Sequence, residues 1–135
     1  MLKDTKLKLI GTLSANGVLS TNGINVKDYK NLMVQVMTTG SATLTFKFQM
    51  GVKSDETPPT FSSAASYTNP WSFVESYDNN NTSSNIVGST GVTLTGTDIV
   101  ANYVVNTNNA YWFDIQVSGY SAGTITAYIV STNNA

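Results

Sequence analysis

The stretch Ala42-Thr43-Leu44-Thr45-Phe46-Lys47-Phe48-Gln49-Met50 decides the fold class of this 135-residue chain. Its apolar residues occupy every second position, and Thr, Lys and Gln fill the positions between them. Successive side chains of a β-strand point to opposite faces, so this alternation predicts a strand with one face in a core and the other in water. Helical spacing, with apolar residues three and four positions apart, is absent from this stretch.

The segment immediately before this strand predicts its partner. Leu32, Val34 and Val36 alternate with more polar neighbours, among them Gln35 on the opposite face. Thr38-Thr39-Gly40-Ser41 has the composition of a short turn. Residues 31–50 are therefore expected to form a β-hairpin.

Strand patterns continue in both directions along the chain. Further short strands are expected around residues 6–9, 71–74, 92–95, 99–105, 111–117 and 125–129. Asn16-Gly17 and Asn22-Gly23 are strong turn signals, because both residue types tolerate positive φ. About eight strands separated by turns predict an all-β fold: a single antiparallel β-sandwich, jelly-roll-like, formed by one domain over residues 1–135.

One strand differs from the others in its pattern. In residues 99–105, Ile99, Ala101, Tyr103 and Val105 alternate with Val100, Asn102 and Val104. Apolar residues at both sets of positions are typical of a strand covered on both faces.

Composition excludes several classes of function. Charged residues make up 11% of the chain, against about 25% in an average protein. The chain contains no Cys and no His, and all seven basic residues are Lys. It therefore lacks a thiol nucleophile, a zinc-thiolate site and the usual general base. Without a basic footprint, nucleic-acid binding is not expected.

The acidic residues form no convincing catalytic or metal-binding motif. Glu75 and Asp78 are close in sequence, and Asp114 occupies an expected outward position. Solvated surface charge is the expected role of all three. The oxygen-rich run Asp78–Asn81 leaves calcium as an alternative, but EF-hand spacing is absent and a turn is expected. No catalytic residue, cofactor or metal ligand is assigned, and an enzyme is not expected.

The aromatic residues and the N-terminus are the candidate protein-binding elements. Trp112 lies between Tyr111 and Phe113, so alternation predicts that it points outward. Trp71 and Tyr120 are further interface candidates, since Trp and Tyr are enriched at interfaces. Residues 1–13 are expected to form an N-terminal arm on a neighbouring chain, using the apolar side chains Leu2, Leu7 and Leu9.

Two stretches resemble small virion proteins of tailed bacteriophages. Residues 111–127, Tyr-Trp-Phe-Asp-Ile-Gln-Val-Ser-Gly-Tyr-Ser-Ala-Gly-Thr-Ile-Thr-Ala, are similar to a hairpin of these proteins. Tyr29–Val36 and the following Thr/Gly turn resemble their first hairpin. The family includes capsid decoration, or cement, proteins. The resemblance implies a β-sandwich or jelly roll, often trimeric, on the outside of the head shell.

The resulting hypothesis is a bacteriophage capsid decoration protein. It would be made in the host cytoplasm, form a homo-oligomer, expected to be a trimer, and bind the major capsid protein on the virion surface. Several modest contacts made at once would hold it there. The alternatives are a carbohydrate- or receptor-binding module that stacks sugars on Trp71 and Trp112, and a tail or baseplate component. Neither nucleic acid nor membrane is an expected partner.

Overall fold

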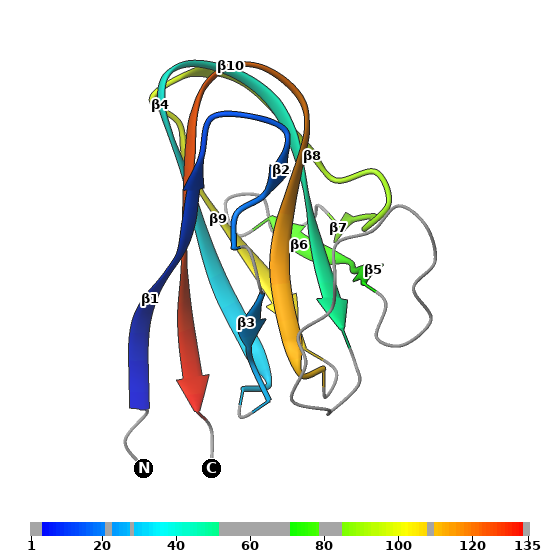
Figure 1. Ribbon diagram of the computed structural model, residues 1–135. Coiled ribbons are helices and arrows are strands. Elements are labelled where there is room, and N and C mark those ends of the chain that lie inside the picture. Colours follow the sequence, from blue (N-terminus) through cyan, green and yellow to red (C-terminus); the bar gives the residue numbers. More distant parts are fainter. Residues whose placement is uncertain are drawn as a thin grey trace.

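Two long strands cross the molecule and bend together near their midpoints. The computed structural model describes residues 4–20, 23–27, 29–51, 71–78, 85–107 and 110–133. Strand β4 spans Asn31–Gly51 and strand β10 spans Trp112–Asn133, and the two pair antiparallel along their length. Figure 1 shows both strands arching over the top of the molecule. Each long strand therefore contributes to two layers.

The shorter strands follow β4 and β10 around the same bend. Beside β10 lie β1 (Asp4–Leu13), β2 (Gly17–Val18) and β3 (Ile24–Asn25). Beside β4 lie β9 (Val100–Asn106) and β8 (Val92–Thr97). The ten strands are completed by β5 (Ser72–Phe73), β6 (Ser76–Asp78) and β7 (Asn85–Ile86). The described residues contain strands and no helix.

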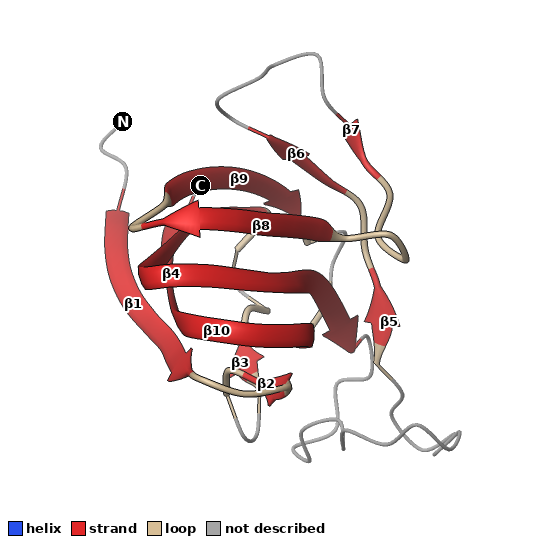
Figure 2. Ribbon diagram, turned by 90° about the horizontal axis from the view of Figure 1, so that it is seen from above, coloured by secondary structure: helices blue, strands red, loops and turns tan. Residues whose placement is uncertain are grey.

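The bend divides the sheet into two leaves that face each other. The first leaf contains β1, the second half of β10, the first half of β4, and β9, β6 and β7. The second leaf contains β2, β3, the first half of β10, the second half of β4, and β8 and β5. Figure 2 looks down on the bend, where β8, β4 and β10 lie side by side. The predicted all-β, antiparallel, sandwich-like fold is confirmed.

The hydrophobic core lies between the leaves. Phe46 of the second leaf and Tyr103 of the first make an edge-to-face contact with ring centroids 5.4 Å apart. Phe48 lies 5.7 Å from the same Tyr103 ring. Burial, with a smaller contribution from the charge of Asp78, raises the pKa of Tyr103 to about 12. The leaves are therefore held together mainly by apolar and aromatic contacts.

Residues with positive φ build the bend. In β4, Gly40 has φ of 73°, and Asp98, between β8 and β9, has φ of 50°. These two residues face each other: the Gly40 N–H donates to the Asp98 carboxylate (2.8 Å), and the Asp98 N–H donates to the Gly40 carbonyl (3.2 Å). In β10, Gly119 and Gly123 also have positive φ. Glycine adopts this conformation without the strain that a Cβ causes, so the strands turn while staying paired.

Both hairpins expected from the sequence are wrong. Residues 31–38 do not pair with residues 41–50, because both halves of β4 pair with β10. Likewise, residues 118–123 bend β10 rather than reverse it. Asn16-Gly17 also joins β1 and β2 without pairing them, because both lie along β10. The turn-forming residues correctly predicted where the chain changes direction. At each of these places, however, the chain passes from one leaf to the other and does not fold back on the preceding strand.

Candidate functional site

The outer face of the first leaf is rich in exposed and half-buried apolar side chains. We call it the apolar face; its apolar members are Leu9, Met33, Met37, Tyr77, Val100, Val104, Tyr128 and Val130. Val100 is 56% exposed, Leu9 51% and Met37 37%. Soluble proteins scatter such side chains singly, and gathering them on one face marks an interaction site.

Three neighbouring rows of paired residues form the centre of the apolar face. The middle row contains Tyr128, Gln35 and Asn102, which lie opposite one another on β10, β4 and β9. One flanking row contains Thr126, Met37 and Val100, and the other contains Val130, Met33 and Val104. A polar row is thus placed between two largely apolar rows.

The central part of the apolar face carries no charge. On the neighbouring strands β1, β10, β4 and β9, the described outward side chains of the first leaf are only apolar, hydroxyl or amide groups. The polar contacts there include a hydrogen bond of 3.0 Å between the Thr12 and Thr126 hydroxyls. Charge depletion is characteristic of the centre of a protein interface.

Along β4, β8 and β10, the outer face of the second leaf has the opposite chemistry. We call it the polar face; its members are Ser41, Thr43, Thr45, Lys47, Thr93, Thr95, Thr97, Gln116 and Ser118. Hydroxyl pairs cross its strands, at 2.9 Å between Thr45 and Thr93 and at 3.3 Å between Ser41 and Thr97. Its polar groups are suited to contact with water.

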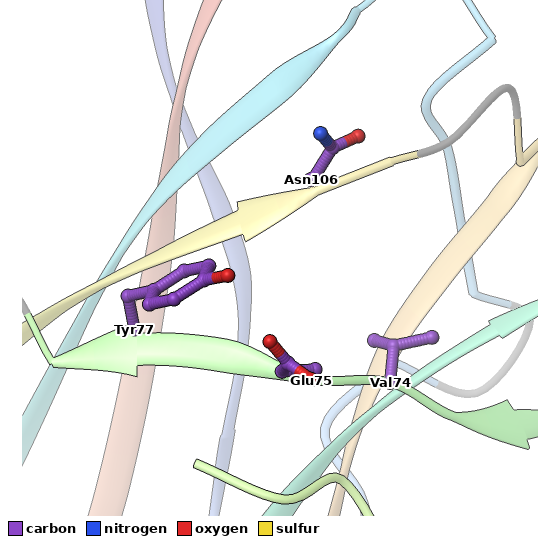
Figure 3. A pocket seen from close by; sticks show the side chains of 4 residues that line it. All are labelled: Val74, Glu75, Tyr77 and Asn106. Atoms are coloured by element: carbon purple, nitrogen blue, oxygen red, sulfur yellow. The ribbon is translucent and has the colours of Figure 1, made fainter. Parts of the chain in front are cut away.

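A small cavity adjoins the rim of the apolar face. It has a volume of about 320 Å³ and is lined by Val74, Glu75, Tyr77 and Asn106. Figure 3 shows Glu75 and Tyr77 on the β6 segment and Asn106 on neighbouring β9. A hydrogen bond to the Glu75 carboxylate and the charge of that group raise the pKa of the exposed Tyr77 hydroxyl. Glu75 places a negative charge beside the otherwise uncharged face.

The expectation that Asp114 points into solvent is wrong. Asp114 is only 1% exposed, and its Oδ1 accepts hydrogen bonds from the Ser20 N–H (3.0 Å) and the Ile115 N–H (2.7 Å). Burial raises its pKa to about 6, although both hydrogen bonds oppose the rise. The side chain ties the segment before β3 to β10. It is not among the described residues that line the Glu75 cavity.

The expectation that Trp112 is exposed is also wrong. Trp112 is 9% exposed, and its indole N–H has no hydrogen-bond partner in the described structure. Its side chain lies on the side of β10 opposite Phe113, as alternation predicts, but both sides of the first part of β10 are covered. Neighbouring Gln49, opposite Asp114 on β4, is likewise buried at an expected outward position. The face on which a sugar ring was expected to stack is therefore not open at Trp112.

The two other aromatic candidates have local structural contacts. Trp71 is half-buried, and its ring lies so close to Gly23 that a Cβ at that position would be 2.8 Å from it. Tyr120, at the bend, donates its hydroxyl to the Gly123 carbonyl (2.7 Å). Its backbone N–H donates to the Asn16 side chain (2.8 Å). Whether either residue also contacts a partner stays a prediction.

The expected N-terminal arm is, from residue 4 onward, an edge strand of its own sheet. β1 pairs with β10 from Asp4 opposite Asn133 to Leu13 opposite Ile125. Leu9 lies on the apolar face; the backbone of Leu7 pairs with Val130, and Leu2 lies outside the described residues. Contact between this segment and a neighbouring chain stays a prediction.

The described residues contain neither a cluster of metal-ligating side chains nor a helix that could span a membrane. No three acidic, His or Cys side chains there come together as a metal site. Of the calcium candidate Asp78–Asn81, only Asp78 lies within the described residues. The described part also has no helix with the length and apolar character needed to span a membrane.

The sequence contained a signal for the apolar face that pointed to the wrong conclusion. Val100 and Val104 made the strand over residues 99–105 look covered on both faces. In the structure, its inner face meets the second leaf and its outer face is uncovered by the described chain. Met33 and Met37 extend that outer face across β4, which only the strand register could establish.

Comparison with known proteins identifies a shared fold. No protein-family model matches the sequence, and no curated protein matches it. Among solved structures, the SPBc2 prophage-derived protein YomS is similar, with a TM-score of 0.61 over 97% of this chain and 96% of that chain. The two sequences are 12% identical. The architecture is therefore shared with a prophage-derived protein over nearly the full length of both chains.

Proposed function

We propose that this chain is a bacteriophage structural protein, and specifically a capsid decoration protein that binds the outer surface of the major capsid protein lattice and stabilises the head. The observation that carries the proposal is the exposed, uncharged apolar face of the first leaf. Such a surface is suited to permanent burial against protein. The fold shared with a prophage-derived protein supports a phage origin.

The physical basis of the proposed activity is multivalent docking. An oligomer presents the same contact surface several times, so that modest individual contacts combine into tight binding. The low charge of the chain, with net charge −1, favours close protein contact over mutual repulsion. No bond is made or broken in this mechanism. The absence of His and Cys from the sequence is consistent with it.

The sugar-binding alternative has lost its main support. It relied on Trp112 as an outward stacking platform, and Trp112 is buried. A tail or baseplate component would bind other proteins by the same kind of contact. The position of the chain on the particle therefore distinguishes this alternative from a capsid decoration protein.

The test uses particles from the encoding phage with this gene deleted. Purified protein is added, the particles are sedimented, and bound copies are counted and located by electron cryo-microscopy. The expected result is saturable binding at symmetry-equivalent sites on the head, with DNA retained to a higher temperature. Binding only at the tail supports the alternative, and no binding to any part of the particle contradicts both.

A further inference from the structure

We propose that a second copy of this chain covers the apolar face, with the two first leaves packed face to face about a two-fold axis. The inference rests on the proposed function in one respect only, that this chain works as part of a protein assembly. With a second copy on the apolar face, the dimer would contact the capsid through its other surfaces. The evidence is the arrangement of the three central rows, the absence of charge among them and the size of the face.

The polar groups of the apolar face can pair with copies of themselves. The middle row carries the Gln35 and Asn102 amides and the Tyr128 hydroxyl. Amides and hydroxyls both donate and accept hydrogen bonds, so each can be satisfied by its own copy. Charged groups would repel their copies, and the described outward positions of the first leaf on β1, β10, β4 and β9 hold none. The face is therefore chemically complementary to itself.

The order of the rows fits a two-fold axis along the middle row. Rotation about that axis places Gln35 and Asn102 opposite their own copies. It also places the row of Met37 and Val100 over the row of Met33 and Val104 of the other chain. Apolar side chains then meet apolar side chains on both sides of the amide row. An isologous contact of this kind closes at two copies, and not at the three expected from the sequence.

The size of the face corresponds to a small protein interface. The four strands β1, β10, β4 and β9, spaced about 4.8 Å apart and each with about seven residues rising about 3.4 Å, give a projected area of about 460 Å². Projecting side chains make the accessible area larger than this projection. A standard interface buries about 800 Å² on each partner.

The edge of the first leaf is less suited to binding a second copy. At the outer strand, Lys8 occupies an inner register position opposite Ile129 but remains exposed. A charge on an edge strand opposes the addition of another strand. Face-to-face packing is therefore favoured over edge-to-edge pairing through β1.

The first test is the mass of the purified chain, measured by light scattering without capsids. The wild type is expected at about twice the 14.4 kDa of one chain. The double variant Met37→Lys and Val100→Lys places two charges opposite each other on the apolar face and is expected at the mass of one chain. The control is Thr43→Lys and Thr95→Lys, which makes the same change between opposite residues of the polar face and is expected to remain dimeric.

Two results would overturn the inference: a monomeric wild type, or an oligomer whose mass the apolar-face variant leaves unchanged. A second measurement covers the case in which the lysine variant fails to fold. The chain has no Cys, so Gln35→Cys introduces a single thiol at the predicted axis. Facing sheets lie about 10 Å apart, too far for a direct disulfide, so a short bis-maleimide is used.

The expected result is a cross-linked dimer with Gln35→Cys and at least a tenfold lower yield with Thr43→Cys on the polar face. Equal yields, or none with Gln35→Cys, contradict the face-to-face geometry. Capsid binding is measured separately. A dimer that does not bind particles contradicts the proposed function alone, and a monomer that binds them contradicts this inference alone.

Discussion

The two outer faces of this molecule belong to the same bent sheet and have opposite chemistry. The apolar face of the first leaf exposes Met37 and Val100, which lie opposite each other on β4 and β9. The polar face of the second leaf has Thr43 and Thr95 in the equivalent relation on β4 and β8. A shared backbone architecture therefore supports one surface that water can cover and one that is suited to burial by protein.

The difference shows that exposure alone does not define the functional surface of a β-protein. Both faces contribute strands to the same core, so the outward positions on either leaf are free to vary without loss of that core. On the polar face, the outward positions hold hydroxyl pairs such as Thr45 with Thr93. On the apolar face, they hold apolar side chains, whose burial is favourable by roughly 25 cal/mol per Å².

The largest expected effect comes from breaking the core that both faces share. Phe46→Ala removes a fully buried ring that contacts Tyr103 of the other leaf, and we expect it to lower the free energy of unfolding by about 3–5 kcal/mol. Chemical denaturation followed by tryptophan fluorescence and by circular dichroism provides the measurement. Because the leaves share one core, the two signals should change together; separate transitions would show that the faces belong to independent units.

The second effect is a pH dependence that arises in the second leaf. The folded-state pKa of Asp114 is raised from 3.8 to about 6, so the folded state holds this proton more tightly than the unfolded state. Stability therefore falls as the pH rises from about 4 to about 6, by roughly 2–3 kcal/mol from this group.

The matched variant for this prediction is Asp114→Asn, which keeps the acceptor oxygen but does not titrate. The free energy of unfolding is measured by denaturation at several pH values between about 4 and 6. Relative to Asp114→Asn, the wild type should be more stable at the low end of this range than at the high end. Parallel pH profiles for the two proteins would contradict the role of Asp114.

The third effect tests the bend that separates the two faces. A Cβ at Gly123 would lie 2.8 Å from the Cα of Ala42, and the residue has φ of 89°. Gly123→Ala is expected to cost more than about 2 kcal/mol, because it combines backbone strain with a clash between β10 and β4. Gly40→Ala is the control, since φ is also positive but the Cβ would meet nothing within 4 Å, and it should cost about 1 kcal/mol. Equal losses would show that the close approach is unimportant.

The smallest effect concerns the polar face itself. Thr93→Val removes one hydroxyl of the 2.9 Å pair with Thr45, and we expect a loss below about 1 kcal/mol because the pair is exposed. Thr95→Val, on the same strand and face, makes the same chemical change outside that pair. Thermal unfolding of both variants gives the comparison. A loss well above that of a surface hydrogen bond would indicate that the polar face is buried in the working assembly.

Prediction from the sequence was most successful for the strands and least successful for their connections. The alternation in residues 42–50 marks the second half of β4, and Leu32, Val34 and Val36 mark its first half. The Thr38–Ser41 turn signal between them lies at the bend. The error was to join the halves by a local reversal, because turn residues report backbone conformation and not the strand that pairs with the chain beyond them.

The candidate site was predicted less well than the strands, because local residue patterns do not report which parts of the chain pack together. Trp112 and Asp114 were expected outward from alternation, yet the structure buries both. Val100 and Val104 were expected to be covered on both sides, yet their outer side is open in the described chain. Alternation separates the two faces of a strand, but it does not identify what lies above either face.

By itself, the sequence determined the all-β class, the positions of the main strands and the absence of His and Cys chemistry, because these depend on local periodicity and residue type. Only the tertiary structure decided that β4 and β10 bend together, that Met33, Met37, Val100 and Val104 join into one face, and that Trp112 is buried. Those properties depend on which strands pair and in what register, and pairing between residues far apart in the chain leaves no mark in the local pattern.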